Sequence, residues 1–70
     1  MIEKHKYYTN RFTAGMYHLY YALEDSEELN DLTKVVDLTN RSITYIQREH
    51  VIEVEPDNID EEYLEVAKAY

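Results

Sequence analysis

Carboxylates are the side chains with the most concentrated chemical character in this sequence, and they fall into two groups. Eight of the fifteen acidic residues lie between Glu49 and Glu65, a stretch that contains no Lys or Arg. Five more lie between Glu24 and Asp31. A protein surface that grips nucleic-acid phosphates can also bind carboxylates at comparable spacing, so the two groups predict binding to a basic, nucleic-acid-binding protein.

The acids are expected to form short rows on helices and on a strand. Carboxylates three or four residues apart on a helix lie about 5–6 Å from one another at Cβ, and alternate residues of a strand share one face. The expected rows are Asp57, Glu61 and Glu65; Glu24, Glu28 and Asp31; and Glu53 with Glu55. The complete candidate binding surface is Glu24, Asp25, Glu27, Glu28, Asp31, Glu53, Glu55, Asp57, Asp60, Glu61, Glu62 and Glu65. Tyr63 is a candidate aromatic anchor for the partner.

The overall charge supports this prediction but leaves a simpler one open. Fifteen acids against seven bases give a formal net charge of -8, which argues against direct binding to DNA, RNA or an anionic membrane, because each requires a basic surface. The simpler interpretation is that the acids form a solvated surface that keeps a small domain soluble. Both interpretations stay open at the level of the sequence.

Histidine, serine and glycine give no support to metal binding or catalysis. No two of His5, His18 and His50 are four residues apart and there is no cysteine, so a zinc site has no sequence support. Ser26 and Ser42 do not lie in a nucleophile-elbow context, and one glycine cannot build a phosphate-binding loop. We expect a binding protein without metal or cofactor, and not an enzyme.

The length of the chain predicts one domain, residues 1–70, with a small core. A domain of this size buries only about 60% of the surface of its unfolded chain. Small domains compensate with disulfides, metals or self-association. Cysteine is absent, so we expect a homodimer. No apolar stretch approaches the roughly 20 residues that span a bilayer and no signal peptide is recognisable, so the expected location is the cytoplasm.

Tyrosine is unusually frequent, at eight residues against one Phe and no Trp. A buried tyrosine hydroxyl needs a hydrogen-bond partner, whereas a half-buried one suits an interface. The tyrosines therefore lie either at a binding surface or at the rim of a thin core.

The pattern of apolar residues predicts an α+β domain of three helices and a β-hairpin. Helical spacing predicts helices over residues 10–24 and 26–39, and a final helix over residues 58–70 after Pro56. Residues 42–46 and 51–55 are rich in β-branched side chains and predict a hairpin around residues 47–50. The alternative is an all-α fold in which one helix covers residues 26–50.

The length and the acid run from Glu49 to Glu65 give the chain a family resemblance. It resembles the small acidic proteins that bacteriophages make to take over the host, and among them the DNA mimics that inhibit the nucleoid protein HU. The resemblance implies a protein that occupies the DNA-binding surface of HU and excludes DNA. It transfers no individual residues.

Other classes of binding protein share the same acidity. One is an antitoxin-like protein that masks a basic toxin. Another is a transcription regulator that binds RNA polymerase or a sigma factor. A third is a structural subunit of a larger assembly.

Overall fold

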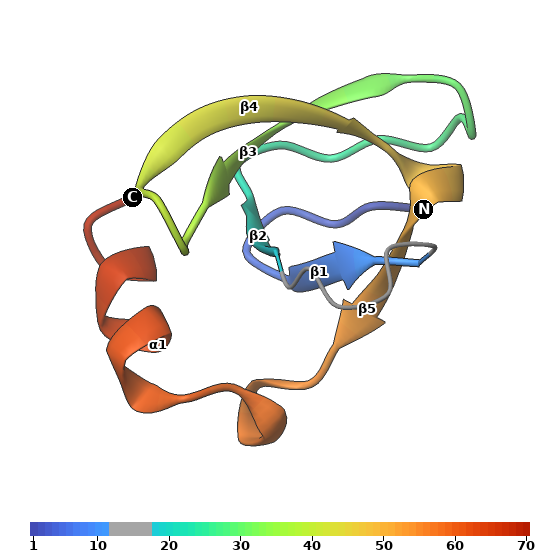
Figure 1. The fold of residues 1–70 in the computed structure, drawn as a ribbon. Helices are drawn as coiled ribbons and strands as arrows, with labels where there is room; N and C mark the ends of the chain where they lie inside the picture. Colours follow the sequence, from blue (N-terminus) through green and yellow to red (C-terminus); the bar gives the residue numbers. More distant parts are fainter. Residues whose placement is uncertain (12–17) are drawn as a thin grey trace.

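One five-stranded antiparallel sheet dominates the computed structural model, which describes residues 1–11 and 18–70 (Figure 1). The strands lie in the order β4-β3-β2-β1-β5, so the first four form a meander and the last returns to pair with β1. The sheet is strongly curled. The strands are β1 (Tyr7–Asn10), β2 (Leu19–Ala22), β3 (Leu32–Asp37), β4 (Ser42–Gln47) and β5 (Val51–Val54).

The strand register separates the apolar side chains into two cores, one on each face of the sheet. Cα partners across neighbouring strands share a face, and side chains alternate between faces along each strand. The first core lies on the face of Tyr8 and its Cα partner Tyr20. The second lies on the face of Tyr21 and its Cα partner Val36. The first core contains Ile2, Tyr8, Tyr20, Ala22, Val35, Ile46 and Val51, and the second contains Leu19, Val36, Leu38, Ile59 and Ala67.

The helix α1 (Glu61–Ala67) covers the second core. Its apolar residues are Tyr63, Leu64, Val66 and Ala67, and they share one side of the helix because each lies three or four positions from another of them. Glu61 and Glu62 lie in its first turn, where negative charge favours the positive end of the helix dipole. The helix is consequently docked by its apolar side and turns its acidic side to solvent.

Asp37, at the end of β3, is the buried acid of the described residues, with 5% of its surface exposed. Its carboxylate accepts hydrogen bonds from the backbone N–H of Thr39 (2.9 Å) and from the Thr39 hydroxyl (2.5 Å). The Nδ1 atom of His18 lies 3.1 Å from its second oxygen. These contacts satisfy the carboxylate and hold the turn from β3 to β4, so Asp37 has a structural role.

The predicted α+β fold of three helices and a hairpin is wrong, and so is the all-α alternative. Residues 19–22 form β2 and residues 32–37 form β3, where helices were predicted. Residues 12–17 of the first predicted helix lie outside the described residues. At the start of the second predicted helix, the side chains of Glu24 and Asp25 instead accept hydrogen bonds from backbone amides of other segments.

The two predicted hairpin strands exist, but they do not pair with each other. β4 pairs with β3 and β5 pairs with β1. A 3₁₀-helix at Arg48–His50 replaces the expected tight turn and redirects the chain to the other edge of the sheet. The final helix begins at Glu61 and not at Asn58, because Pro56–Asn58 forms a separate 3₁₀-helix.

Most of the described tyrosines belong to the cores. The Tyr8 hydroxyl accepts a hydrogen bond from the Glu3 backbone N–H (2.9 Å), and the Tyr20 hydroxyl donates one to Asn10 Oδ1 (3.2 Å). Tyr7 and Tyr21 contact each other with ring centroids 5.1 Å apart, beside the second core. Tyr45 and Tyr70 are instead exposed, at 57% and 48%. The high tyrosine content therefore reflects mainly a core whose hydroxyl groups find partners at its edge.

Burial raises the pKa of Tyr7, Tyr8 and Tyr20 above the ordinary value of 10.0. The folded protein therefore holds these phenolic protons more tightly than the unfolded chain. The resulting stability is fully present below about pH 10 and is lost as the pH rises through the raised pKa values. We expect the melting temperature to fall above about pH 10, and Tyr8→Phe to reduce this fall. Thermal melts across the alkaline range measure it, with Tyr45→Phe as the exposed control. An equal alkaline fall in wild type and Tyr8→Phe would contradict the assignment to Tyr8.

Candidate functional site

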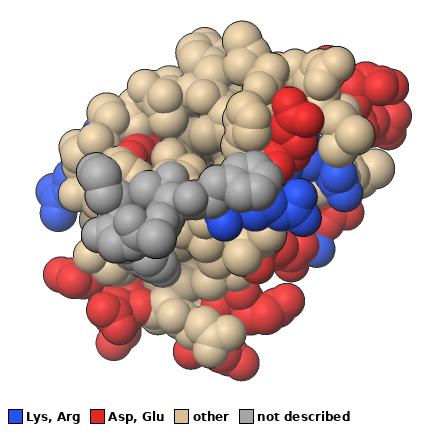
Figure 2. Space-filling view, turned by 45° about the vertical axis from the view of Figure 1, so that its right-hand side comes forward, with Lys and Arg blue, Asp and Glu red and all other residues tan. Residues whose placement is uncertain are grey.

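Six exposed carboxylates follow one another along the chain from the end of β5 to the outer side of α1. We call them the acidic ridge: Glu55, Asp57, Asp60, Glu61, Glu62 and Glu65. Figure 2 shows acidic side chains gathered along the lower part of the molecule, apart from a second group at the upper right. The ridge covers the segment that follows β5 and the short helix α1, which packs against the second core.

The second core fixes the position of the ridge. Ile59 is buried, with 8% of its surface exposed, and anchors the extended chain just before the helix. Ala67, with 3% exposed, anchors the end of the helix. Between these two points the backbone carbonyl of Asp60 accepts bonds from the N–H groups of Tyr63 (3.0 Å) and Leu64 (3.4 Å). The carboxylates are therefore held on an ordered backbone and face solvent.

The charge of the acidic ridge is compensated at one position among the described residues. Lys68 Nζ lies 2.8 Å from Glu65 Oε1, and this contact raises the pKa of Lys68 above its ordinary value of 10.5. Within residues 1–11 and 18–70, Glu55, Asp57 and Glu62 form no ion pair and no side-chain hydrogen bond. Their oxygens remain able to accept contacts from a cationic partner.

Most acids of the loop between β2 and β3 accept hydrogen bonds from other parts of the protein, unlike those of the acidic ridge. Asp25 accepts a hydrogen bond from the Lys4 backbone N–H (2.8 Å), and Glu24 accepts one from the Lys34 backbone N–H (2.9 Å). Asp31 accepts a bond from the Ser26 hydroxyl (3.3 Å). Three of the five candidate acids in this loop thus hold the loop in place. The side chains of the other two, Glu27 and Glu28, are exposed and form no hydrogen bond within the described part of the chain.

The predicted rows of carboxylates are only partly present. Glu61 and Glu65 lie four residues apart on α1, as predicted, but Asp57 precedes the helix in a separate 3₁₀-helix. The row of Glu24, Glu28 and Asp31 does not form, because residues 24–31 are not helical. Figure 1 places this loop and α1 at opposite ends of the molecule, so the two acid groups do not form one continuous face.

Glu53 and Tyr63 are less available than the sequence indicates. Glu53, within β5, lies 3.8 Å from Lys6 Nζ. Tyr63 is half-buried and packs against the second core. Its ring therefore holds α1 against the sheet.

Arg41 is the residue near the acidic ridge that the sequence did not indicate. The turn from β3 to β4 carries Arg41 to a hollow of about 530 Å³ that Glu62, Glu65 and Tyr70 also line. The Tyr70 hydroxyl lies 3.5 Å from the Arg41 backbone oxygen. Arg41 is distant from these acids along the chain, and no local sequence pattern predicts that they line the same hollow.

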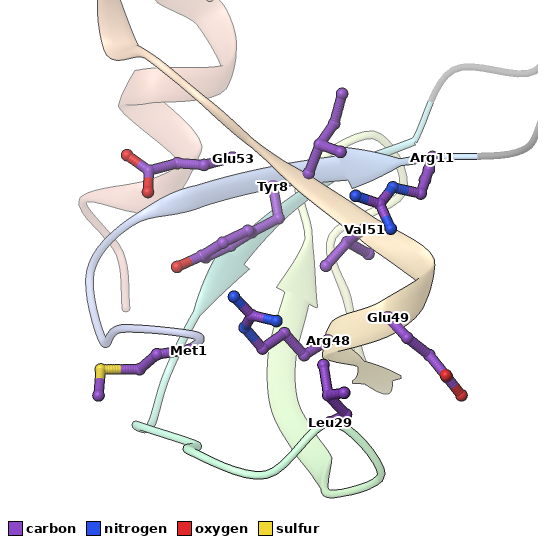
Figure 3. A pocket seen from close by; sticks show the side chains of 9 residues that line it. Met1, Tyr8, Arg11, Leu29, Arg48, Glu49, Val51 and Glu53 are labelled. Carbon is purple, nitrogen blue, oxygen red and sulfur yellow. The ribbon is translucent and has the colours of Figure 1, made fainter.

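A second hollow, of about 410 Å³, lies beside the 3₁₀-helix at Arg48–His50 (Figure 3). Arg11 and Arg48 bring two guanidinium groups to it, but Glu49 and Glu53 line it as well. Its charge is therefore mixed, and it does not have the convergent polar groups of a catalytic pocket.

The described residues contain no cluster of three or more His, Asp or Glu side chains arranged to hold a metal ion. Across residues 1–11 and 18–70, no helix has the length and apolar character needed to cross a membrane. Comparison with protein-family models, with curated proteins and with solved structures found no match to this chain. The remaining indications of function lie on the surface of the molecule.

Proposed function

We propose that this protein is an acidic DNA mimic, which binds a host nucleoid protein of the HU type at its DNA-binding surface and blocks DNA by competition. The observation that carries the proposal is the acidic ridge, whose carboxylates are exposed, held on an ordered backbone and largely uncompensated. The resemblance to phage proteins that act on HU supplies the kind of partner. The place of action would then be the host cytoplasm.

The physical basis of the proposal is the similarity between the ridge and a phosphate backbone. Duplex DNA presents a charge about every 1.7 Å of its axis, and a protein that binds it releases condensed counterions. Glu61 and Glu65 on one side of α1 lie about 6 Å apart at Cβ, and the neighbouring ridge acids extend the same negative surface. Lysine and arginine side chains arranged for phosphates would meet carboxylates in their place.

The salt dependence of binding tests this proposal. The affinity for a purified HU-type protein should fall roughly 10- to 100-fold between about 50 and 200 mM salt, because several charge contacts are screened. Calorimetric titration at both salt concentrations measures the change. An affinity that does not depend on salt would contradict charge mimicry and would favour a partner such as RNA polymerase, bound through apolar contacts.

A further inference from the structure

We propose that the hollow beside the 3₁₀-helix at Arg48–His50 binds a small organic anion, whose phosphate or carboxylate group is held by Arg48 and Tyr8. The hollow has a volume of about 410 Å³, and sites for small molecules typically measure about 300–1,000 Å³. Hydrogen-bond donors and apolar side chains line it together. A ligand that joins an oxyanion to an apolar body matches both parts of this lining.

Arg48 supplies the charged donor of this site. Its side chain forms no ion pair and no hydrogen bond within residues 1–11 and 18–70. Figure 3 shows the guanidinium groups of Arg48 and Arg11 pointing toward the interior of the hollow. A guanidinium offers its N–H donors as a planar fork that matches the oxygens of a carboxylate or a phosphate. The hollow therefore presents a group suited to an oxyanion.

The two acids that line the hollow do not neutralise Arg48. Glu49 Oε1 lies 3.7 Å from His50 Nε2, and Glu53 Oε2 lies 3.8 Å from Lys6 Nζ. Neither carboxylate forms an ion pair with Arg48. In Figure 3 the Glu49 carboxylate points away from both guanidinium groups. The donors of Arg48 therefore remain available to a ligand.

Tyr8 supplies a neutral donor that the fold holds in place. It is buried in the first core, with 3% of its surface exposed, and it also lines the hollow. The hydroxyl oxygen accepts a hydrogen bond from the Glu3 N–H (2.9 Å), but the hydroxyl proton has no acceptor among the described residues. Burial raises the pKa of Tyr8 above 10.0, so this proton is present at neutral pH. A donor fixed by the core loses little conformational entropy when it binds a ligand.

Exposed apolar side chains complete the lining. Met1 is 53% exposed, Leu29 51% and Ile52 45%, and all three line the hollow. The apolar body of a ligand would cover them and remove apolar surface from water.

The acidic ridge lies away from this site. The 3₁₀-helix at Arg48–His50 and α1 are at opposite sides of the molecule (Figure 1). Salt at about 0.15 M screens interactions between exposed charges beyond about 8 Å. The net charge of -8 is therefore compatible with anion binding at this hollow.

Titration of the protein with four small molecules tests the site. The probes are phenyl phosphate, benzoate, benzyl alcohol as the neutral control, and inorganic phosphate as the control without an apolar body. Amide chemical shifts in NMR spectra at about 0.15 M salt follow binding. We expect saturable shifts at residues of the hollow, with a dissociation constant of about 1 mM or below for phenyl phosphate or benzoate. The tighter of these two identifies the oxyanion, and both controls should bind about tenfold more weakly or worse, because each lacks one part of the match.

Three variants assign the binding to named side chains. Arg48→Gln should weaken binding about tenfold, because it removes charged hydrogen bonds. Tyr8→Phe keeps the ring and removes one donor, so it should weaken binding about fivefold. Arg41→Gln is the matched control, because it changes the net charge equally but lies near the acidic ridge. It should leave the affinity within about twofold of the wild type, and thermal melts confirm that each variant is folded.

The absence of saturable shifts with both phenyl phosphate and benzoate would overturn the proposal. So would benzyl alcohol or inorganic phosphate that binds as tightly as these two, or an equal loss of affinity in Arg48→Gln and Arg41→Gln. No partner protein is present, so the result does not depend on the function of the acidic ridge.

Discussion

Neutralising three carboxylates of the acidic ridge is expected to weaken binding to an HU-type protein by roughly 10- to 100-fold. The variant is Glu55→Gln, Asp57→Asn and Glu62→Gln, which together change the net charge from -8 to -5. These three side chains are exposed and make no ion pair with any described residue. Each contact with a cationic partner contributes up to about 1 kcal/mol, and 1.4 kcal/mol corresponds to a factor of ten. Calorimetric titration of wild type and variant measures the change.

The matched control changes the same number of charges at the other end of the molecule. Glu27→Gln, Glu28→Gln and Asp31→Asn also give a net charge of -5. The amide that replaces the Asp31 carboxylate keeps an oxygen able to accept the bond from Ser26. This control should alter the affinity less than twofold. If both triple variants lose affinity equally, the attraction is a property of the total charge and the acidic ridge is not the binding surface.

Tyr63→Ala is expected to destabilise the protein by about 2–4 kcal/mol and to weaken partner binding with it. The ring packs against the second core, and removal of a large aromatic side chain from such a position leaves a cavity. With α1 held less firmly, the ridge carboxylates lose their fixed positions. Chemical denaturation measures the stability, and titration at a temperature where the variant is folded measures the affinity.

Tyr63→Phe is the control for this prediction. The Tyr63 hydroxyl makes no hydrogen bond within residues 1–11 and 18–70, so the phenylalanine variant should match the wild type in both stability and affinity. A Tyr63→Phe protein that is stable but binds its partner weakly would show that the hydroxyl contacts the partner. That result would restore Tyr63 as a binding residue and contradict its purely structural role.

The sequence indicates where two of the five strands lie but not how they pair. β-branched residues and alternation identify residues 42–46 and 51–55 as strands, and β4 and β5 occupy those positions. Their partners are β3 and β1, because the 3₁₀-helix between them carries the chain across the sheet. Pairing over such distances depends on tertiary packing, which short-range patterns do not encode.

The helices predicted in the first half of the chain are wrong because the apolar spacing of a helix occurs here in strands. Leu29, Leu32 and Val36 lie three and four residues apart, as on a helix. In the structure Leu29 and Leu32 are exposed, while Val35 and Val36 are both buried because the sheet has a core on each face. A sheet covered on both faces loses the strict alternation that reveals a strand.

The candidate surface could be predicted only in outline. The acid run identifies the region of the ridge, but the sequence does not distinguish a carboxylate that projects into solvent from one that holds a loop. Asp25 is engaged by the backbone of Lys4, 21 residues away, and Glu24 by that of Lys34. Those hydrogen bonds arise from the fold. They distinguish the acids of the β2–β3 loop, which hold the loop, from the exposed acids of the acidic ridge.

Competition with duplex DNA tests whether this protein occupies the DNA-binding surface of an HU-type protein. A labelled duplex is bound to an HU-type protein at about 50 mM salt, where phosphate contacts are strong, and this protein is then added. We predict complete release of DNA without a ternary complex, and we predict that this release requires intact ridge carboxylates. DNA that stays bound at concentrations saturating the protein complex, or a ternary complex that contains all three components, would contradict it.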